Sequence, residues 1–284
     1  MKRRNFIQLG AIGPLISSPL VCTTSPTIQT IESSFKHSIC RWCYNKTPLE
    51  ELSEKAKSVG VHSIELLHAE EWRLVQKKGL QCAVGYANDL GLTKGFNDTS
   101  LHAQLLEDYS KVIPMAASDG IPNIICFSGN ANGLSEEEGL ENCAEGLDPI
   151  LKIAEKYNIN IIMELLNSKV DHKDYQCDHT EWGVKLVDKL GSDRFKLLYD
   201  IYHMQIMEGD LISTITKYKD YIAHFHTGGV PGRNEIDETQ EINYTAIMEA
   251  LKENNFDGFV AQEYIPTWEK PFEALSKAIE ICTV

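Results

Sequence analysis

Short apolar runs alternate with helical patterns from residue 35 to the end of the chain, and the alternation repeats eight times. Such alternation is typical of a parallel sheet, and eight strand–helix units are enough to close the sheet into a barrel. Strands are predicted at residues 35–41, 63–67, 81–84, 124–127, 161–165, 196–200, 223–226 and 259–263. The sequence therefore predicts an α/β fold, a (β/α)8 TIM barrel, formed as a single domain by residues 31–284.

Three of the predicted helices carry start signals. Ser135 followed by Glu138 has the pattern of a capping box, and Pro271 suits the first position of the last helix. Ahead of the helix that follows the first strand, Thr47 is predicted as the N-cap and Pro48 as the first helical residue.

The acidic composition limits the class of partner. The chain has 41 Asp and Glu residues against 27 Lys and Arg, a net charge of -14, and its basic residues do not cluster. A nucleic-acid partner needs clustered positive charge to neutralise phosphates and is therefore not expected. No membrane span is expected either, because no apolar run reaches the ~18 residues that a span requires. The expected partner is a small-molecule sugar or hydroxy-keto acid, and the sequence leaves a homo-oligomer open.

Residues 1–30 have the composition of an export leader. Arg3 and Arg4 stand before the pair Phe6-Ile7, a short apolar stretch follows, and a segment rich in Ser, Thr and Pro extends to about Thr30. The arginine pair resembles the twin-arginine signal of bacteria. The leader predicts a periplasmic protein, or a cytoplasmic one if the leader is not a functional signal.

Carboxylates and a histidine end four successive predicted strands, and we call these residues the strand-end cluster. A carboxylate that closes a strand buried on both faces loses its hydration, so something must compensate its charge, and a metal ion does so most often. Three oxygens and one imidazole nitrogen suit a single divalent ion such as Mn²⁺, Mg²⁺, Co²⁺ or Zn²⁺. The strand-end cluster consists of Glu164, Asp200, His226 and Glu263.

Other polar residues are expected near this cluster. His203 follows Asp200 by three residues and could contact a substrate hydroxyl, while Arg233 lies in a glycine-rich loop and could hold an anionic group. His224 shares the inward face of its strand with His226 but lies one layer deeper, so it is interpreted as a core or supporting residue.

Five motifs in order resemble the hydroxypyruvate isomerase branch of the xylose-isomerase-like barrels, and the resemblance covers essentially the whole chain after the leader. The motifs are Glu-Leu-Leu-Asn at 164–167, Tyr-Asp-Ile-Tyr-His-Met-Gln at 199–205, His-Phe-His-Thr-Gly-Gly-Val-Pro-Gly-Arg at 224–233, Glu-Ile-Asn-Tyr at 241–244 and Gln-Glu-Tyr-Ile-Pro at 262–266.

The resemblance implies a metal-dependent isomerase of carbohydrate metabolism. It implies that the strand-end cluster holds the metal, that Glu164 and Glu263 are the catalytic residues that move a proton, and that His203 and Arg233 bind substrate. A metal that bridges the carbonyl and hydroxyl oxygens of an α-hydroxy-ketone stabilises the enediolate left by proton loss, and a carboxylate on each face can take and return the proton.

Two other functions stay open. Typical members of this branch carry glutamine at the position of His226, and a histidine there is more similar to the ketose 3-epimerases. A ketose 3-epimerase or a related sugar-derivative lyase is therefore the first alternative. The second is a barrel that binds sugar without turnover, which would have no need of four convergent metal ligands.

Overall fold

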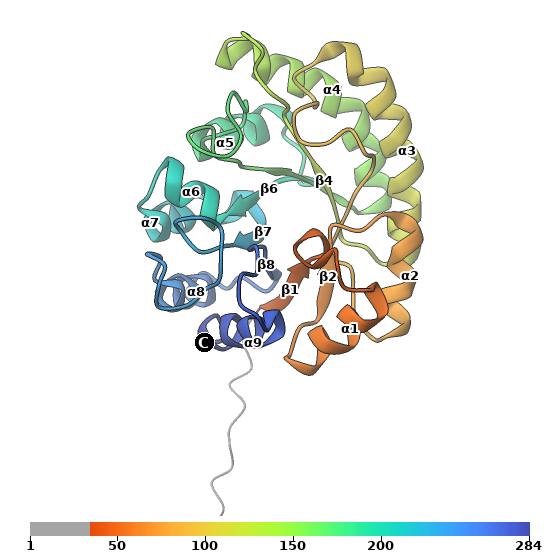
Figure 1. Ribbon diagram of the computed structural model, residues 1–284. Coiled ribbons are helices and arrows are strands. Elements are labelled where there is room, and N and C mark those ends of the chain that lie inside the picture. The colour runs from red at the N-terminus through yellow and green to blue at the C-terminus, as the bar shows by residue number, and fades with distance from the viewer. Residues whose placement is uncertain (1–34) are drawn as a thin grey trace, which may run out of the picture. The chain divides into compact units, whose positions relative to one another are not determined.

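The computed structural model describes residues 35–284, and the predicted leader lies outside the described part of the chain. Eight parallel strands form one sheet in the order β2-β1-β8-β7-β6-β5-β4-β3. The outermost strands, β2 and β3, are joined by isolated parallel bridges from Ser63 to Gln81 and from Leu67 to Gly85. The sheet is therefore a nearly closed barrel, and the helices surround it (Figure 1).

The strands are β1 (Lys36–Cys40), β2 (Ser63–Glu65), β3 (Val84–Gly85), β4 (Asn123–Cys126), β5 (Asn160–Glu164), β6 (Phe195–Asp200), β7 (Ile222–Thr227) and β8 (Phe259–Gln262). The α-helices are α1 (Leu49–Ser58), α2 (Ala69–Lys77), α3 (His102–Asp119), α4 (Glu136–Tyr157), α5 (Thr180–Leu190), α6 (Ile201–Met207), α7 (Leu211–Lys217), α8 (Tyr244–Glu253) and α9 (Pro271–Ile281). Short 3₁₀ helices are η1 (Arg41–Tyr44), η2 (Thr99–Leu101) and η3 (Lys219–Tyr221).

The predicted barrel is confirmed, and the clearest difference in strand position is at the third strand. The prediction was residues 81–84, whereas β3 comprises Val84 and Gly85. The backbone N–H of Ala83 donates to the Ser63 side-chain hydroxyl at 2.9 Å instead of to a strand carbonyl. This side-chain contact interrupts the ladder between β2 and β3 and shortens the strand.

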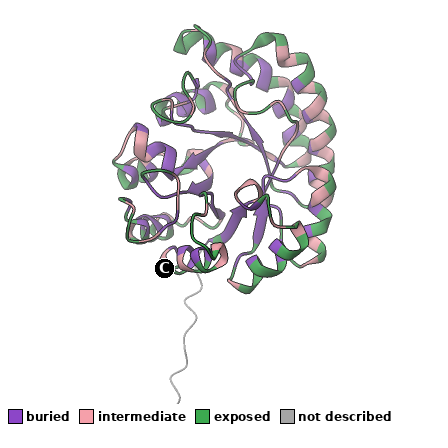
Figure 2. Cartoon of the chain, in the orientation of Figure 1, coloured by how far each residue is buried: buried purple, intermediate pink, exposed green. Residues whose placement is uncertain are grey.

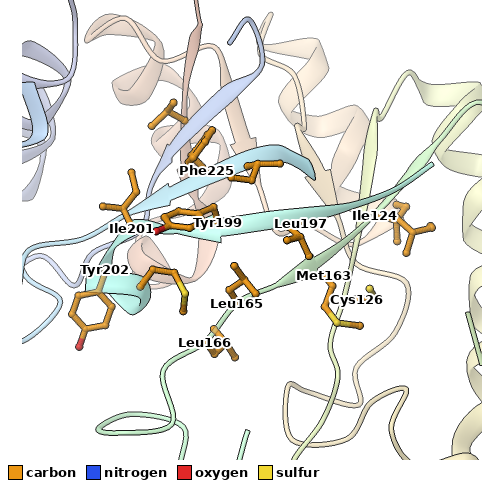
Figure 3. Packing of buried hydrophobic residues seen from close by; sticks show 14 of the residues in the cluster. Ile124, Cys126, Met163, Leu165, Leu166, Leu197, Tyr199, Ile201, Tyr202 and Phe225 are labelled. Atoms are coloured by element: carbon orange, nitrogen blue, oxygen red, sulfur yellow. The ribbon is translucent and has the colours of Figure 1, made fainter. Parts of the chain in front are cut away.

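Side chains of each strand alternate between two apolar layers. Ile162, Leu198 and Ala261 belong to a small cluster inside the barrel. Met163 and Leu197 point the other way, into the larger layer between sheet and helices, part of which Figure 3 shows. The strands are buried along their length, and the helices expose only their outer sides (Figure 2).

This alternation places the strand-end cluster. Glu164 follows Ile162 by two residues, Asp200 follows Leu198 by two, and Glu263 follows Ala261 by two, so all three point into the barrel. They lie one layer above the inner apolar residues, at the carboxyl ends of their strands, where barrel enzymes keep their active sites.

The helix starts agree with the sequence at α4 and α9 but not at α1. Ser135 accepts the Glu138 backbone N–H and Glu138 accepts the Ser135 N–H, which completes the capping box. Pro271 occupies the first turn of α9. At α1 the prediction was wrong by one residue, because the Pro48 carbonyl accepts the first helical hydrogen bond, from the Leu52 N–H at 2.9 Å. Pro48 is therefore the N-cap and makes no side-chain cap.

Within residues 35–284, none of the helices combines the length and the apolar character needed to cross a membrane.

Candidate active site and metal centre

The fold brings the whole strand-end cluster together. β6 and β7 pair with Asp200 opposite His226, and β7 pairs with β8 with His226 opposite Ala261, two residues before Glu263. Each of the four residues offers one ligand atom, and these atoms all lie within 4.8 Å of one another. All four side chains are buried. The structure therefore presents three carboxylates and one imidazole as a compact set of donors.

Ion pairs connect the members of the cluster. Nδ1 of His226 lies 3.1 Å from Oε1 of Glu164 and 2.7 Å from Oε2 of Glu263. Nη2 of Arg233 lies 3.1 Å from Oδ2 of Asp200 and 2.6 Å from Oε2 of Glu263. Three buried carboxylates thus share one guanidinium and one imidazole.

The pKa values of the three carboxyl groups indicate that one guanidinium and one imidazole do not balance all of the negative charge in the cluster. Burial raises the pKa of Asp200 well above its usual range even though Arg233 lowers it. Burial and the charge of Glu263 raise the pKa of Glu164. Burial alone would also raise the pKa of Glu263, but the charges of Arg233 and His226 hold it well below its usual range. A further cation among these donors would relieve the excess negative charge, so the residues fit a divalent ion.

His203 presents an N–H to the same region. The Asn167 side-chain oxygen accepts the backbone N–H groups of Val170 and Asp171, so the amide nitrogen faces His203 and donates to its Nδ1 at 2.7 Å. The ring proton is therefore on Nε2, which is buried without a hydrogen-bond partner and lies 3.6 Å from Oδ2 of Asp200. Burial and the charge of Arg233 lower the pKa of His203 well below its usual range, so the ring is neutral.

Arg233 is held by the protein's own groups. Besides its two ion pairs, its guanidinium lies 5.2 Å from the Trp42 ring and 5.3 Å from the Tyr202 ring, which is cation–π distance. Trp42 also donates its indole N–H to Oε1 of Glu263 at 2.6 Å. The sequence analysis assigned no role to Trp42 or to Asn167, although Asn167 is the last residue of the motif at 164–167.

A second polar group lies beneath the cluster, and we call Cys40, Glu65 and His224 the lower cluster. Oε1 of Glu65 lies 2.8 Å from Nε2 of His224 and 2.9 Å from Nε2 of His226. Sγ of Cys40 lies 3.8 Å from the same His226 nitrogen. Burial alone would raise the pKa of Glu65, but His224 and His226 lower it to about 2, so Glu65 is ionised.

Glu65 was missed by sequence reasoning although a signal for it exists. It closes the apolar run of β2 just as Glu164 closes that of β5. His224, expected one layer deeper than His226, lies on that inner face and is fully buried.

A cavity of about 220 Å³ is lined by residues that follow β2, β3 and β4, among them His68, Tyr86 and Phe127. The charges of the strand-end cluster act on one residue that lines this cavity. Burial raises the pKa of Tyr86, and the charges of Glu263 and Glu164 raise it further. Larger cavities lie elsewhere among residues 35–284, for example one at the amino ends of β4 and β5 and one beside α5 and α7.

Comparison with known proteins identifies the relatives of this barrel. The family model described as xylose isomerase-like TIM barrel matches residues 53–282. The hydroxypyruvate isomerase of Escherichia coli is 29% identical over 206 residues, which cover 72% of this chain and 73% of that protein. The 2-oxo-tetronate isomerase of Haemophilus influenzae is 26% identical over 237 residues, which cover 80% of this chain and 91% of that protein.

Among solved structures, an AP endonuclease of family 2 from Brucella melitensis superimposes with a TM-score of 0.78 at 21% identity, over 87% of this chain and 99% of that one. A likeness at this identity shows the barrel fold alone. The two curated relatives are named as isomerases, and their likeness supports the same class of enzyme here.

Proposed function

Because this chain belongs to the xylose isomerase-like TIM barrel family, we propose that it is a metal-dependent isomerase of a small hydroxy-carbonyl or sugar substrate. The observation that carries the proposal is the convergence of the strand-end cluster, whose ligand atoms lie within 4.8 Å of one another. Hydroxypyruvate, which the name of the E. coli relative gives as its substrate, is the first compound to test.

The strand-end cluster would hold one divalent ion, and Mn²⁺, Mg²⁺, Co²⁺ and Zn²⁺ all suit its three carboxylates and one imidazole. When bound, such an ion supplies polarisation of the carbonyl and hydroxyl oxygens and stabilises the negative charge that develops on them. The carboxylates of Glu164 and Glu263 then remain the groups that can move a proton.

We assign the proton transfer to these two glutamates. Glu263 has a lowered pKa and is ionised, so it can accept a proton from the carbon that bears the hydroxyl. The electron pair of that C–H bond moves into the carbon–carbon bond, and the carbonyl oxygen takes the negative charge, which gives an enediolate.

Glu164, with a raised pKa, is suited to return a proton to the former carbonyl carbon. The hydroxyl proton passes to the other oxygen, and the isomer results with its atoms conserved. Glu263 is then protonated and Glu164 ionised, and proton exchange with solvent returns both to their starting states.

His203 and Arg233 are assigned to substrate binding. The Nε2–H of His203 is buried without a partner and so can donate to a substrate oxygen at little cost. Arg233, which is 13% exposed, can exchange part of its contact with Asp200 for the carboxylate of a hydroxy-keto acid. A substrate with both a hydroxy-ketone and a carboxylate would use both residues.

Metal analysis and a substrate screen test this proposal. Protein folded in its native host is expected to contain a divalent ion, and chelation should abolish turnover of hydroxypyruvate or of a ketose in a screen followed by NMR. Adding back Mn²⁺ or Co²⁺ should restore it. Full turnover after the metal has been removed would overturn the metal-dependent assignment.

Ketose 3-epimerisation is the second candidate, and one observation favours it. Glu164 from β5 and Glu263 after β8 approach the same His226 nitrogen from different strands, so they could serve opposite faces of one carbon. The screen separates the reactions, because an epimerase places solvent deuterium on the original carbon and an isomerase places it on the neighbouring carbon. A barrel that only binds sugar would show neither.

A further inference from the structure

The lower cluster contains a carboxylate for which the proposed chemistry gives no role. Glu65 is fully buried at the end of β2, on the opposite side of the His226 ring from Glu164 and Glu263. Its carboxylate is too deep to contact a substrate, since the His226 ring lies between it and the two catalytic glutamates. Its partners in the structure are the two histidines of β7, His224 and His226.

The hydrogen bonds decide which nitrogen of each histidine carries a proton. An ionised carboxylate can only accept hydrogen bonds. Because Oε1 of Glu65 lies at hydrogen-bond distance from Nε2 of both His224 and His226, both rings must carry their proton on Nε2. For His226, Nδ1 is then the nitrogen that faces Glu164 and Glu263. An ion bound there would displace the proton that Nδ1 shares with these carboxylates and take its lone pair, while Nε2 keeps its own proton.

We propose that Glu65 is a positioning residue that keeps the proton of His226 on Nε2 and thereby directs Nδ1 toward the divalent ion. The inference rests on the proposed metal site and adds to it a residue outside the strand-end cluster. The negative charge of Glu65 also makes Nδ1 of the imidazole a stronger electron-pair donor to the ion, as carboxylate partners of metal-bound histidines do.

His224 completes this arrangement. It donates to the same Glu65 oxygen at 2.8 Å, and the two imidazole rings lie edge to face with centroids 5.2 Å apart. Glu65 is thus held by two donors from one strand, which fixes its oxygen beneath His226.

A metal ion bound on the Glu65 side of His226 would require the opposite protonation of that ring. Cys40, Glu65 and His226 could themselves surround a metal ion, since their donor atoms also lie within 4.8 Å of one another. In that case Nε2 of His226 would have to lose its proton to become a ligand. A hydrogen bond from Nε2 to Glu65 and a metal bond at Nε2 exclude each other.

The first test is the protonation of His226 in the wild-type protein. In nitrogen-15 NMR spectra of metal-free protein, with His226 assigned by comparison with His226→Gln, we expect a slowly exchanging proton on Nε2. This expectation holds whether the His226 ring is charged or neutral, because in both forms Nε2 carries the proton that it donates to Glu65. A His226 ring without a proton on Nε2 would overturn the proposal.

The second test is metal affinity, measured from the visible absorption of Co²⁺ during titration. We expect Glu65→Gln, which keeps the size but removes the charge, to weaken binding roughly 10–100-fold, and Glu65→Leu to weaken it at least as much. The matched control is Glu235→Gln, because Glu235 is also buried but accepts hydrogen bonds from Thr267 and Trp268 instead of from a histidine.

The control should bind Co²⁺ like the wild type. A loss of less than about fivefold in folded Glu65→Gln protein would overturn the positioning role, given the size of such effects elsewhere. If Glu65→Leu does not fold, Glu65→Gln and the wild-type spectrum still decide the question. Wild-type protein that binds no Co²⁺ would instead contradict the proposed metal site, so the two failures are distinguishable.

Discussion

At the scale of single residues, surroundings separate groups that the sequence treats alike. Glu164 and Glu263 both end apolar strands and both contact Nδ1 of His226. Glu263 also pairs with Arg233 and accepts the Trp42 N–H, and its pKa is lowered, whereas burial raises that of Glu164. Two carboxylates with opposite shifts are suited to work as base and acid in one reaction.

Replacing either glutamate should therefore act on the chemical step. We expect Glu164→Gln and Glu263→Gln to lower kcat by roughly 10²–10⁴-fold, because glutamine cannot exchange a carboxyl proton, with a much smaller change in KM. Steady-state kinetics at saturating metal measure both constants. A Glu263→Gln enzyme of near-normal kcat would remove Glu263 from the reaction.

A histidine far from the site predicts a pH dependence of stability. Burial and the charge of His62 lower the pKa of His37 from 6.5 to about 4. Between pH 4 and pH 6.5, His37 is therefore protonated in the unfolded chain and neutral in the folded chain. This contribution to stability is thus complete above pH 6.5 and is lost as the pH falls toward 4.

The free energy of unfolding should fall by about 3 kcal/mol at most over this pH window, given 1.36 kcal/mol per pKa unit. Urea unfolding of wild type and His37→Gln at several pH values measures it, and the His37→Gln profile should be flatter in this window. Parallel profiles would show that His37 does not carry the effect.

At the scale of elements, one side chain can serve both a helix and the site. Asp200 ends β6 and is the N-cap of α6: its Oδ1 accepts the N–H groups of Tyr202 and His203, while Oδ2 faces Arg233. The cap begins the helix that carries His203 and so places that ring beside the strand-end cluster.

Two substitutions should separate these roles. Asp200→Asn keeps the cap but not the anionic donor, so we expect near-normal stability of the metal-free protein with metal binding weakened. Asp200→Ala should cost a further ~1 kcal/mol, the usual value of a lost N-cap. Denaturant unfolding without metal and Co²⁺ titration give the two readings. Equal stability of both variants would show that the cap contributes nothing.

The elements also show how far the sequence could be used. Buried parallel strands are continuous apolar runs, so the number and order of the eight strands were predictable, and so was the convergence of Glu164, Asp200, His226 and Glu263 at their ends. Contacts that depend on how distant side chains meet were not, such as Trp42 with Glu263. Strand β3 was misplaced because a Ser63 side chain replaces a backbone partner, which no periodicity reveals.

At the scale of the whole molecule, the first described residues already belong to the barrel and its core. Phe35 is buried, and β1 pairs with both β2 and β8 from Lys36 onward. The sheet therefore does not need the predicted leader to complete its hydrogen bonding. We propose that residues 1–30 serve export to the periplasm and take no part in folding.

Deleting residues 1–30 should leave folded, active protein with an unchanged unfolding midpoint. Fusing the same residues to a reporter enzyme should direct it to the periplasm, and a leader with Arg3 and Arg4 replaced by Lys is the control that should not. Loss of folding on deletion would show that the segment is structural.

The most direct test of the account is the fate of the substrate hydrogen. With a substrate that is turned over in deuterium oxide, wild-type enzyme loaded with a divalent ion should incorporate deuterium at carbon, because a carboxylate that takes the proton exchanges it with solvent. Chelation, Glu164→Gln and Glu263→Gln should each abolish the incorporation. Turnover that conserves the C–H label completely, and that continues at a normal rate in Glu263→Gln or without metal, would contradict a metal-dependent proton transfer between two glutamates.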